Sequence, residues 1–495
     1  MEGFGKRDYS RLFVLSETAM LIGGRWRIKR MKRRKHTLYR SEQLEVRHKL
    51  VIHFVVFAIL TIFIGKSLFV KSDLFFLYLY GVLVTVVLTI NFYFAIFKYE
   101  DPAILAENIE RDNLKKGIKP KSPLVSCMVA VFNEEDAIEQ CILSLLAQTY
   151  ENKEIIFVND GSTDKTAEIL DQYARDGSIK VIHQKNSGKK RALGKAMREA
   201  HGSIFAFSDS DSVWAVDALE KIVRIFNVFP DVGGVSGHFR LKNSATNILT
   251  RAQDSWADGQ FAIRKAFESY FGAVTCISGP LAAFRREAIY NFIPAWEQDM
   301  FLGQEFRFAT DRTLTGFLLG SKWIGKKLKE KYAQDDCVRG ADYPLRDWKV
   351  VYSKSAKSWT LLPDTFRSLI KQHIRWKKSF IRNTFFTGSF YWRKPFLPSL
   401  VYYLHIVFVL IGPVIAFRHL IYLPIQGNVW AAILYVMGIV FIGFMFGLAY
   451  RLENRGSDSH IWIYRPVMSL LSTLVLSWII FYSALTIKKM VWYRG

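Results

Sequence analysis

The stretch LVSCMVAVFNEEDAIEQCILSLLAQTYENKEIIFVNDGSTD, residues 124–164, carries the pattern that best predicts the fold. The apolar run 124–131 predicts a buried strand, the 3.6-residue periodicity of 134–148 predicts a helix, and 154–158 predicts a second strand. The same alternation continues with strands expected at 179–183 and 203–207 and a helix at 189–200. Strands that alternate with helices predict an α/β fold with a mostly parallel sheet, whose ligands bind at the carboxyl ends of the strands.

Composition places this domain beside a membrane. Half of the 495 residues are hydrophobic and the mean hydropathy is +0.10, although 23% of the residues are charged. This combination excludes a disordered chain, a collagen and a disulfide scaffold. It indicates a chain that is divided between membrane and cytosol.

Long apolar runs flank the α/β region on both sides. Val51–Val70 and Leu74–Phe97 are each long enough to cross about 30 Å of hydrocarbon as a helix. Ser399–Phe417 and Asn428–Tyr450 predict two further spans. Pro466–Ile487 has basic residues on both flanks, which favours a re-entrant hairpin over a single crossing that would put the C-terminus outside.

Two initial crossings return the chain to the side on which it began, so we expect a multi-pass protein of the plasma (inner) membrane whose α/β domain is cytosolic. The expected division is a basic N-terminal segment 1–49, two transmembrane helices 50–97, the α/β domain 98–362, interfacial helices 363–395, transmembrane or re-entrant helices 396–487, and a tail 488–495.

The charge balance predicts anionic partners. Lys and Arg total 68 against 44 acidic residues, a net charge of +24. The chain has no recognisable nucleic-acid motif, so membrane lipids and a phosphorylated substrate are the expected partners, with no nucleic acid and no obligatory protein partner. The four cysteines form no C-x-x-C pair, which predicts buried, reduced thiols rather than a zinc site.

Acidic side chains follow three of the expected strands. Asn133 and Glu134 come after the first, Asp160 after the second, and Asp209 and Asp211 after the fourth. Because parallel strands end at one edge of a sheet, these groups should gather there, where clustered carboxylates need a cation. If the backbone stays extended, Asp209 and Asp211 point to the same side and can share a divalent ion with substrate phosphates. The alternative is a solvated acidic loop.

A basic loop reads KNSGKKR at residues 185–191. Glycine followed by cations at the start of a helix suits a diphosphate, through amide donors and positive charge. The alternative is an exposed basic helix face.

These motifs occur in an order that resembles a known family: VFNE at 131–134, NDGS at 159–162, DSD at 209–211, DR at 311–312 and QHIRW at 372–376. The order resembles the family-2 processive glycosyltransferases, which include hyaluronan, chitin and cellulose synthases. SYFG at 269–272, CISGPL at 276–281, QHIRWKKSFIR at 372–382 and WYRG at 492–495 are most similar to hyaluronan synthases.

The resemblance implies a GT-A-like domain that polymerises UDP-GlcNAc and UDP-GlcA with inversion and passes the growing polysaccharide across the membrane. It implies that Asp311 is the catalytic base and that Asp211, with Asp209, ligates Mg²⁺ or Mn²⁺. The remaining expected contacts to donor or acceptor are Asn133, Glu134, Asp160, Lys189, Arg191, Asp209, Ser278, Arg312, Gln372, Arg375, Trp376, Trp492 and Arg494.

Two departures leave the sugar open. The family usually reads GDDR where this chain has ATDR at 309–312, and residues 321–348 look like an insertion. The alternatives are a homopolymer of GlcNAc such as chitin, a non-processive transferase that loads one sugar onto a lipid phosphate, and a non-catalytic membrane scaffold.

Overall fold

The computed structural model describes residues 75–308, 310–453 and 457–489. The basic segment 1–49, the predicted span Val51–Val70, and Trp492 and Arg494 lie outside the described residues.

In this part of the chain eight strands form one mixed sheet in the order β3-β2-β1-β4-β7-β6-β10-β5. Their bounds are β1 Val125–Val131, β2 Lys153–Asn159, β3 Lys180–His183, β4 Ile204–Ser208, β5 Val213–Trp214, β6 Val232–Leu241, β7 Ala282–Arg285 and β10 Lys349–Thr360; β8 Met300–Phe301 and β9 Gln304–Glu305 form a separate hairpin.

The expected α/β pattern is confirmed for the strands from β1 to β4. β1 pairs in parallel with both β2 and β4, and β2 pairs in parallel with β3. The expectation of a mostly parallel sheet is wrong beyond β4, because β7 runs antiparallel to both β4 and β6. The chain reaches β7 after a helical excursion and enters the sheet from the opposite end.

The helices are α3 Phe75–Tyr93, α4 Pro102–Leu114, α5 Ile138–Leu146, α6 Thr166–Ala174, α7 Lys189–Glu199, α8 Ala218–Val228, α9 Ile248–Gly259, α10 Ala266–Tyr270, α11 Arg286–Ile289, α12 Ile293–Glu297, α13 Thr310–Lys331, α14 Asp336–Arg339, α15 Phe366–Phe386, α16 Phe396–Phe417, α17 Leu423–Ile425, α18 Val429–Glu453, α19 Arg465–Leu471 and α20 Ile479–Leu485. A π-helical segment, η2 (Gln260–Lys265), joins α9 to α10. The stretch 321–348 holds the end of α13 and α14.

The main core lies between the sheet and its helices. β1 is buried along its whole length. Its Cys127 and Val129 pack with Ile142 of α5 and Ile222 of α8. A strand covered on both faces reads as a continuous apolar run, which is why residues 124–131 do not alternate.

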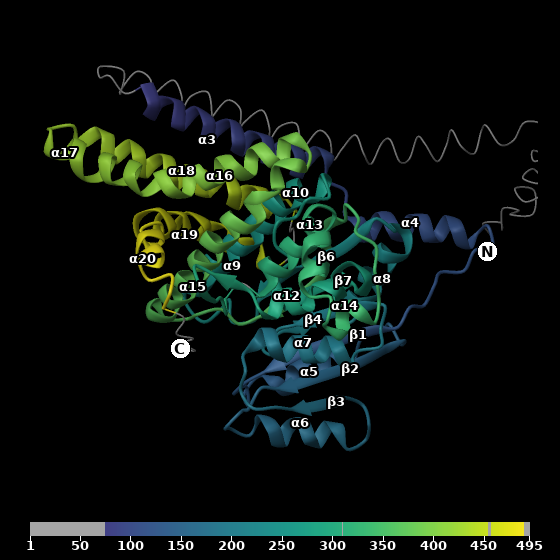
Figure 1. Cartoon of the computed structure of the whole chain (residues 1–495). Coiled ribbons are helices and arrows are strands. Elements are labelled where there is room, and N and C mark those ends of the chain that lie inside the picture. The colour runs from purple at the N-terminus through teal and green to yellow at the C-terminus, as the bar shows by residue number, and fades with distance from the viewer. Residues whose placement is uncertain (1–74, 309, 454–456, 490–495) are drawn as a thin grey trace, which may run out of the picture. The chain divides into compact units, whose positions relative to one another are not determined.

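Apolar helices gather at the end of the molecule away from β1–β3 (Figure 1). Among the described residues, three stretches are long and apolar enough to cross a membrane: Gly81–Leu114, Phe396–Ile425 and Val429–Leu448. The pair His460–Leu476 and Ile479–Leu485 is bent by 42°, the geometry of either a broken span or a re-entrant loop. The re-entrant hairpin therefore stays a prediction.

Two small apolar clusters fasten these helices to the α/β domain. Phe267 of α10 packs with Val87 of α3 and Val401 of α16. Leu369 of α15 packs with Met468 of α19. α9 and α10 thus have one side on the sheet and the other on the apolar helices.

Candidate active site

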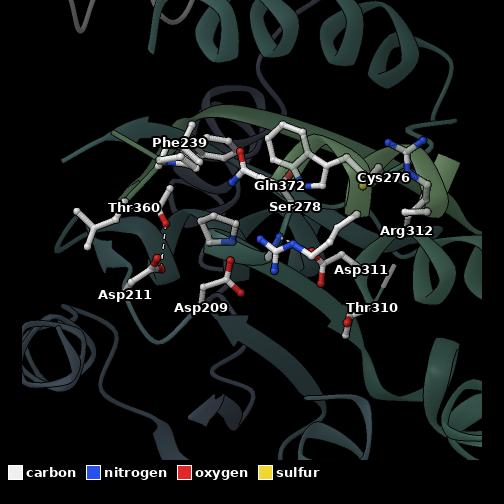
Figure 2. A pocket seen from close by; sticks show the side chains of 18 of the residues that line it. Asp209, Asp211, Phe239, Cys276, Ser278, Thr310, Asp311, Arg312, Thr360 and Gln372 are labelled. Carbon is white, nitrogen blue, oxygen red and sulfur yellow. Dashed lines mark hydrogen bonds between the residues drawn. The ribbon is translucent and has the colours of Figure 1, made fainter. Parts of the chain in front are cut away.

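A cavity of about 790 Å³ opens at the carboxyl ends of β4 and β10. Its walls come from segments far apart in the sequence: the turn after β4, the segment η2, the loop before β7, the start of α13 and one face of α15. Asp209, Asp211 and Asp311 all line it, together with Ser278 and Gln372 (Figure 2). The acidic groups expected at separate points of the sequence therefore share one site.

Asp209 and Asp211 form the acidic edge of the cavity. The segment between them is a turn rather than the extended chain considered from the sequence, and Ser212 N donates to Asp209 O at 3.1 Å. The turn is needed because the chain reverses from β4 into β5. Asp211 accepts a hydrogen bond from Thr360 Oγ1 at 3.0 Å, drawn in Figure 2. Burial and then the neighbouring Asp209 raise the pKa of Asp211.

Lys189, the first residue of α7, reaches this edge and forms an ion pair with Asp209. Burial alone would lower the pKa of the Lys189 ammonium, but the carboxylates of Asp209 and Asp311 outweigh burial and raise it. A positive charge is therefore held at the acidic edge.

Asp311 lies in the first turn of α13, where its Oδ2 accepts the amide of Gly279 at 3.1 Å. A Cβ atom on Gly279 would lie 2.8 Å from both carboxylate oxygens of Asp209 and 2.9 Å from Oδ2 of Asp311. Only glycine lets both carboxylates approach this backbone so closely. Burial, opposed by Lys189, raises the pKa of Asp311 to about 6.

Helix α15 covers the other side of the cavity with Gln372, Arg375 and Trp376. Trp376 stacks on Trp256 of α9, with ring centroids 6.1 Å apart and planes 19° apart. Trp376 is 37% exposed. An aromatic ring that is braced on one face and open on the other suits the apolar face of a sugar.

The π-helical segment η2 supplies a third wall. Its Lys265 donates to Ser278 Oγ at 2.7 Å and to Ser236 Oγ at 2.8 Å, and lies 3.7 Å from the centroid of the Phe261 ring. Burial, with a smaller contribution from repulsion by Arg312, lowers the pKa of Lys265 to about 7. π-helical turns often occur at functional sites.

Three of the expected site residues lie elsewhere. Asp160 accepts hydrogen bonds from the backbone amides of Ser187 and Gly188, each at 2.8 Å. Its carboxylate therefore holds the basic loop in place, and these two amides are not free to bind a diphosphate. Asn133 accepts the amide of Thr163 at 2.8 Å and so joins the loops that follow β1 and β2. Arg191 Nη2 lies 3.4 Å from Glu305 Oε1. Asp160, Asn133 and Arg191 are all absent from the described residues that line the cavity. Their roles in donor binding stay predictions.

The structure also adds residues that the sequence did not single out. Thr360 ends β10, and the strand-end argument that found Asp209 would have found it had β10 been recognised. Lys265 sits in a helical run with no motif around it. Three cysteines are buried as expected, but the expectation is wrong for Cys276, which is partly exposed and lines the cavity because it belongs to the loop before β7.

No group of three or more His, Cys, Asp or Glu side chains in the described part of the chain is placed to hold a metal. The pair Asp209 and Asp211 still fits Mg²⁺ or Mn²⁺, because such ions commonly take one or two carboxylates and complete their shell with water and substrate phosphates. Burial makes the larger contribution to the raised pKa of Asp211, and the neighbouring carboxylate of Asp209 adds a repulsion that a cation would relieve.

Residues 126–292 match the sequence profile described as Glycosyl transferase family 2. This region is a glycosyl transferase family 2 domain. The transferase is 26% identical over 383 residues to hyaluronan synthase of Streptococcus pyogenes, an alignment that covers 76% of this chain and 84% of the relative. It is 30% identical over 276 residues to an N-acetylglucosaminyltransferase of Azorhizobium caulinodans, over 55% of this chain and 63% of that protein. The chain is therefore a glycosyltransferase related to both.

Among solved structures, the transferase is similar to a mannosyltransferase of Pyrobaculum calidifontis in complex with GDP-Man and Mn²⁺. The sequence identity is 18% and the TM-score is 0.43, and the match covers 81% of this chain and 98% of the other.

Proposed function

We propose that this transferase is a membrane-embedded, processive, inverting synthase that joins UDP-sugars into a polysaccharide and passes the product across the membrane. The observation that carries the proposal is the meeting of Asp209 and Asp311 at Gly279 inside one cavity that Asp211 also lines. Donor-side and acceptor-side chemistry can then act on one pair of reacting atoms.

In the proposed reaction Asp311 is the base. The acceptor hydroxyl oxygen bonds to C1 of the donor sugar while the bond from C1 to the diphosphate oxygen breaks. The hydroxyl proton passes to Asp311, and UDP leaves with the electron pair of the broken bond. With a pKa of about 6, Asp311 is ionised at neutral pH yet basic enough to take a proton.

The diphosphate is assigned to Lys189 and Arg375, which line the cavity from α7 and α15. A guanidinium can contact a phosphate with two hydrogen bonds, and an ammonium supplies a compact charge. Asp211 and Asp209 would hold Mg²⁺ or Mn²⁺, which when bound screens the charge of the leaving group. No side chain then has to protonate UDP.

The acceptor is assigned to the opposite side. Trp376, braced by Trp256, would stack on the terminal sugar, and Gln372 and Ser278 line the same wall.

A concentration of cations near Asp311 supports an acidic sugar as one of the two donors. Burial lowers the pKa of Lys265 to about 7 and that of Lys377 to about 8, and repulsion from Arg312 makes a smaller contribution in each case. In the described structure Lys265 donates to serine hydroxyls and forms no direct ion pair, although the nearby carboxylates of Glu268 and Asp311 favour its charged form. A sugar carboxylate placed here would relieve the repulsion, which favours UDP-GlcA together with UDP-GlcNAc over a neutral homopolymer.

The apolar helices support the membrane part of the proposal. α10 packs against α3 and α16. α15, which carries Gln372 to Trp376, packs against α19. A polymer leaving the acceptor side would thus start close to the candidate spans. Trp492 and Arg494 would close over the donor. The last described residues pack against the hairpin of β8 and β9, where Gln304 Nε2 donates to Lys488 O at 2.7 Å.

The test is an assay of the purified full chain with UDP-GlcNAc alone, UDP-GlcA alone and both, each with Mg²⁺ or Mn²⁺. A high-molecular-weight product that requires both donors is the expected result. Polymer from UDP-GlcNAc alone would favour a chitin-like synthase, and a single sugar on a lipid phosphate would favour a non-processive transferase. If no UDP is released under any condition, the remaining alternative is a non-catalytic membrane scaffold.

The tail is tested separately with Trp492→Ala and Arg494→Ala. Loss of polymer at saturating donor is expected, and unchanged synthesis would remove the closing role.

A further inference from the structure

A single buried carboxylate joins three segments that surround the active site. Asp299, 3% exposed, lies in the loop after α12. Lys190 Nζ of α7 is 2.9 Å from Asp299 Oδ2, and Arg382 of α15 donates to Asp299 Oδ1 through Nε at 3.1 Å. The side chains of Lys190 and Arg382 are 6% and 7% exposed, so water cannot replace either ion pair.

Each partner of Asp299 is a close neighbour of a cation assigned to the diphosphate. Lys190 follows Lys189, which pairs with Asp209. Arg382 lies seven residues after Arg375 in the same helix, and residues seven apart share one face. A shift of either helix would therefore move a cation of the site.

The backbone beside Asp299 leads to the proposed base. Phe306 N donates to Asp299 O at 2.7 Å, and Lys190 Nζ donates to Phe306 O at 2.8 Å. These bonds close the loop 299–306 on itself and on α7, a few residues before Asp311.

Asp299 carries the negative charge that neutralises both Lys190 and Arg382. Two cations share one carboxylate in a buried place, and Arg382 lowers the pKa of Lys190 by repulsion, after the larger effect of burial. Without the carboxylate, two buried like charges would face each other and the helices would separate.

We propose that Asp299 is a positioning residue, which holds Lys189, Arg375 and Asp311 in their mutual arrangement without touching either substrate. This inference rests on the proposed sugar transfer. Asp299 would keep the two cations that bind the donor diphosphate at the correct distance from the base, in addition to any effect on folding.

A nearby ion pair supplies a matched control. Glu297, two residues before Asp299, receives both terminal nitrogens of Arg198 at 2.7 Å. It anchors the far end of α7 to α12, and no bond from it to α15 is present among the described residues. Glu297→Gln thus removes a carboxylate from the same region. The ion pair that it breaks connects two segments, whereas the ion pairs of Asp299 connect three.

The experiment compares Asp299→Asn, Glu297→Gln and the charge-balanced pair Asp299→Asn with Lys190→Met in the purified full chain. Asp299→Asn should lower kcat by about 100-fold, the cost typical of a displacement of about 1 Å at a reacting centre. The acidic limb of its kcat/KM profile should move to higher pH, because Lys189 would recede from Asp311, whose pKa it lowers. Glu297→Gln should leave kcat and the limb nearly unchanged.

The paired variant separates positioning from folding. Removing Lys190 together with the carboxylate restores the net charge, so the unfolding temperature should recover while kcat stays low. Recovery of kcat, or an Asp299→Asn variant whose rate falls equally at every pH, would overturn the inference.

Binding of UDP with Mn²⁺, measured by calorimetry, tests the inference even without turnover. Asp299→Asn should weaken UDP at least about tenfold, since both diphosphate cations move. Unchanged UDP affinity in Asp299→Asn would refute the positioning role. A wild-type chain that binds UDP but releases none from UDP-sugars would refute the proposed function instead.

Discussion

Replacing Asp311 by asparagine should abolish turnover and at the same time make the folded protein more stable at neutral pH. Burial raises the pKa of Asp311 from 3.8 to about 6, even though Lys189, Lys265 and the Gly279 amide all favour the ionised form. Since one pKa unit corresponds to about 1.4 kcal/mol, the ionised carboxylate costs the folded state about 3 kcal/mol above pH 6.

The sign follows from the protons bound. Between pH 3.8 and about 6 the folded wild type keeps a proton that the unfolded chain has released, so its stability falls as pH rises through this window. Asparagine resembles the protonated acid and can still accept the Gly279 amide through its carbonyl oxygen. The stability difference between Asp311→Asn and wild type should therefore be small near pH 4 and approach about 3 kcal/mol at pH 7 to 8.

The assay is thermal unfolding of both proteins in the same detergent across this pH range, with UDP release measured in parallel. In wild type the rate should rise with pH through about 6, as Asp311 ionises. Residual turnover of Asp311→Asn near the wild-type level would refute the assignment of the base. A variant that is less stable at pH 7 than wild type would refute the reasoning from burial.

Three further predictions concern the walls of the cavity. Gly279→Ala should lower kcat by about 100-fold with little loss of secondary structure by circular dichroism, because its Cβ would displace the carboxylates of Asp209 and Asp311; an unchanged rate would show that their close approach is not needed. Asp211→Asn should raise the Mg²⁺ or Mn²⁺ concentration for half-maximal rate at least about tenfold, since one of two ligands is lost; an unaltered metal titration would place the ion elsewhere. Lys265→Met should raise KM for UDP-GlcA at least about tenfold, the value of a charged hydrogen bond, and spare UDP-GlcNAc. Wild type should show the same selective loss as pH rises through about 7, where Lys265 loses its proton; equal effects on both donors would argue against a carboxylate site.

The βαβ pattern, the strand-end carboxylates and the helix at Lys189 could be predicted because each depends on neighbours along the chain. Hydrophobic periodicity and the burial of parallel strands act over a few residues, and the observed bounds of β1 to β4 differ from the expected ones by one residue at most. The QHIRW segment was likewise recognisable from its own residues.

The rest depended on contacts between distant segments, which no local pattern encodes. The sequence around Gly279 does not indicate that this glycine lies between two carboxylates. The sequence around Lys265 does not indicate that this lysine is buried against Phe261 and two serines. The antiparallel entry of β7 and the engagement of Asp160 with its own loop are further examples.

The order of the residues alone determined the α/β class, the apolar runs and the acids that would meet at one sheet edge, because periodicity and strand direction are local properties of a chain. Only the tertiary structure decided which of those acids share a cavity, which cations face them, and that Asp299 joins α7 to α15. The physical reason is that burial determines the pKa of a charged group and the strength of its interactions with other charges. Burial exists only once segments far apart in the sequence have packed together.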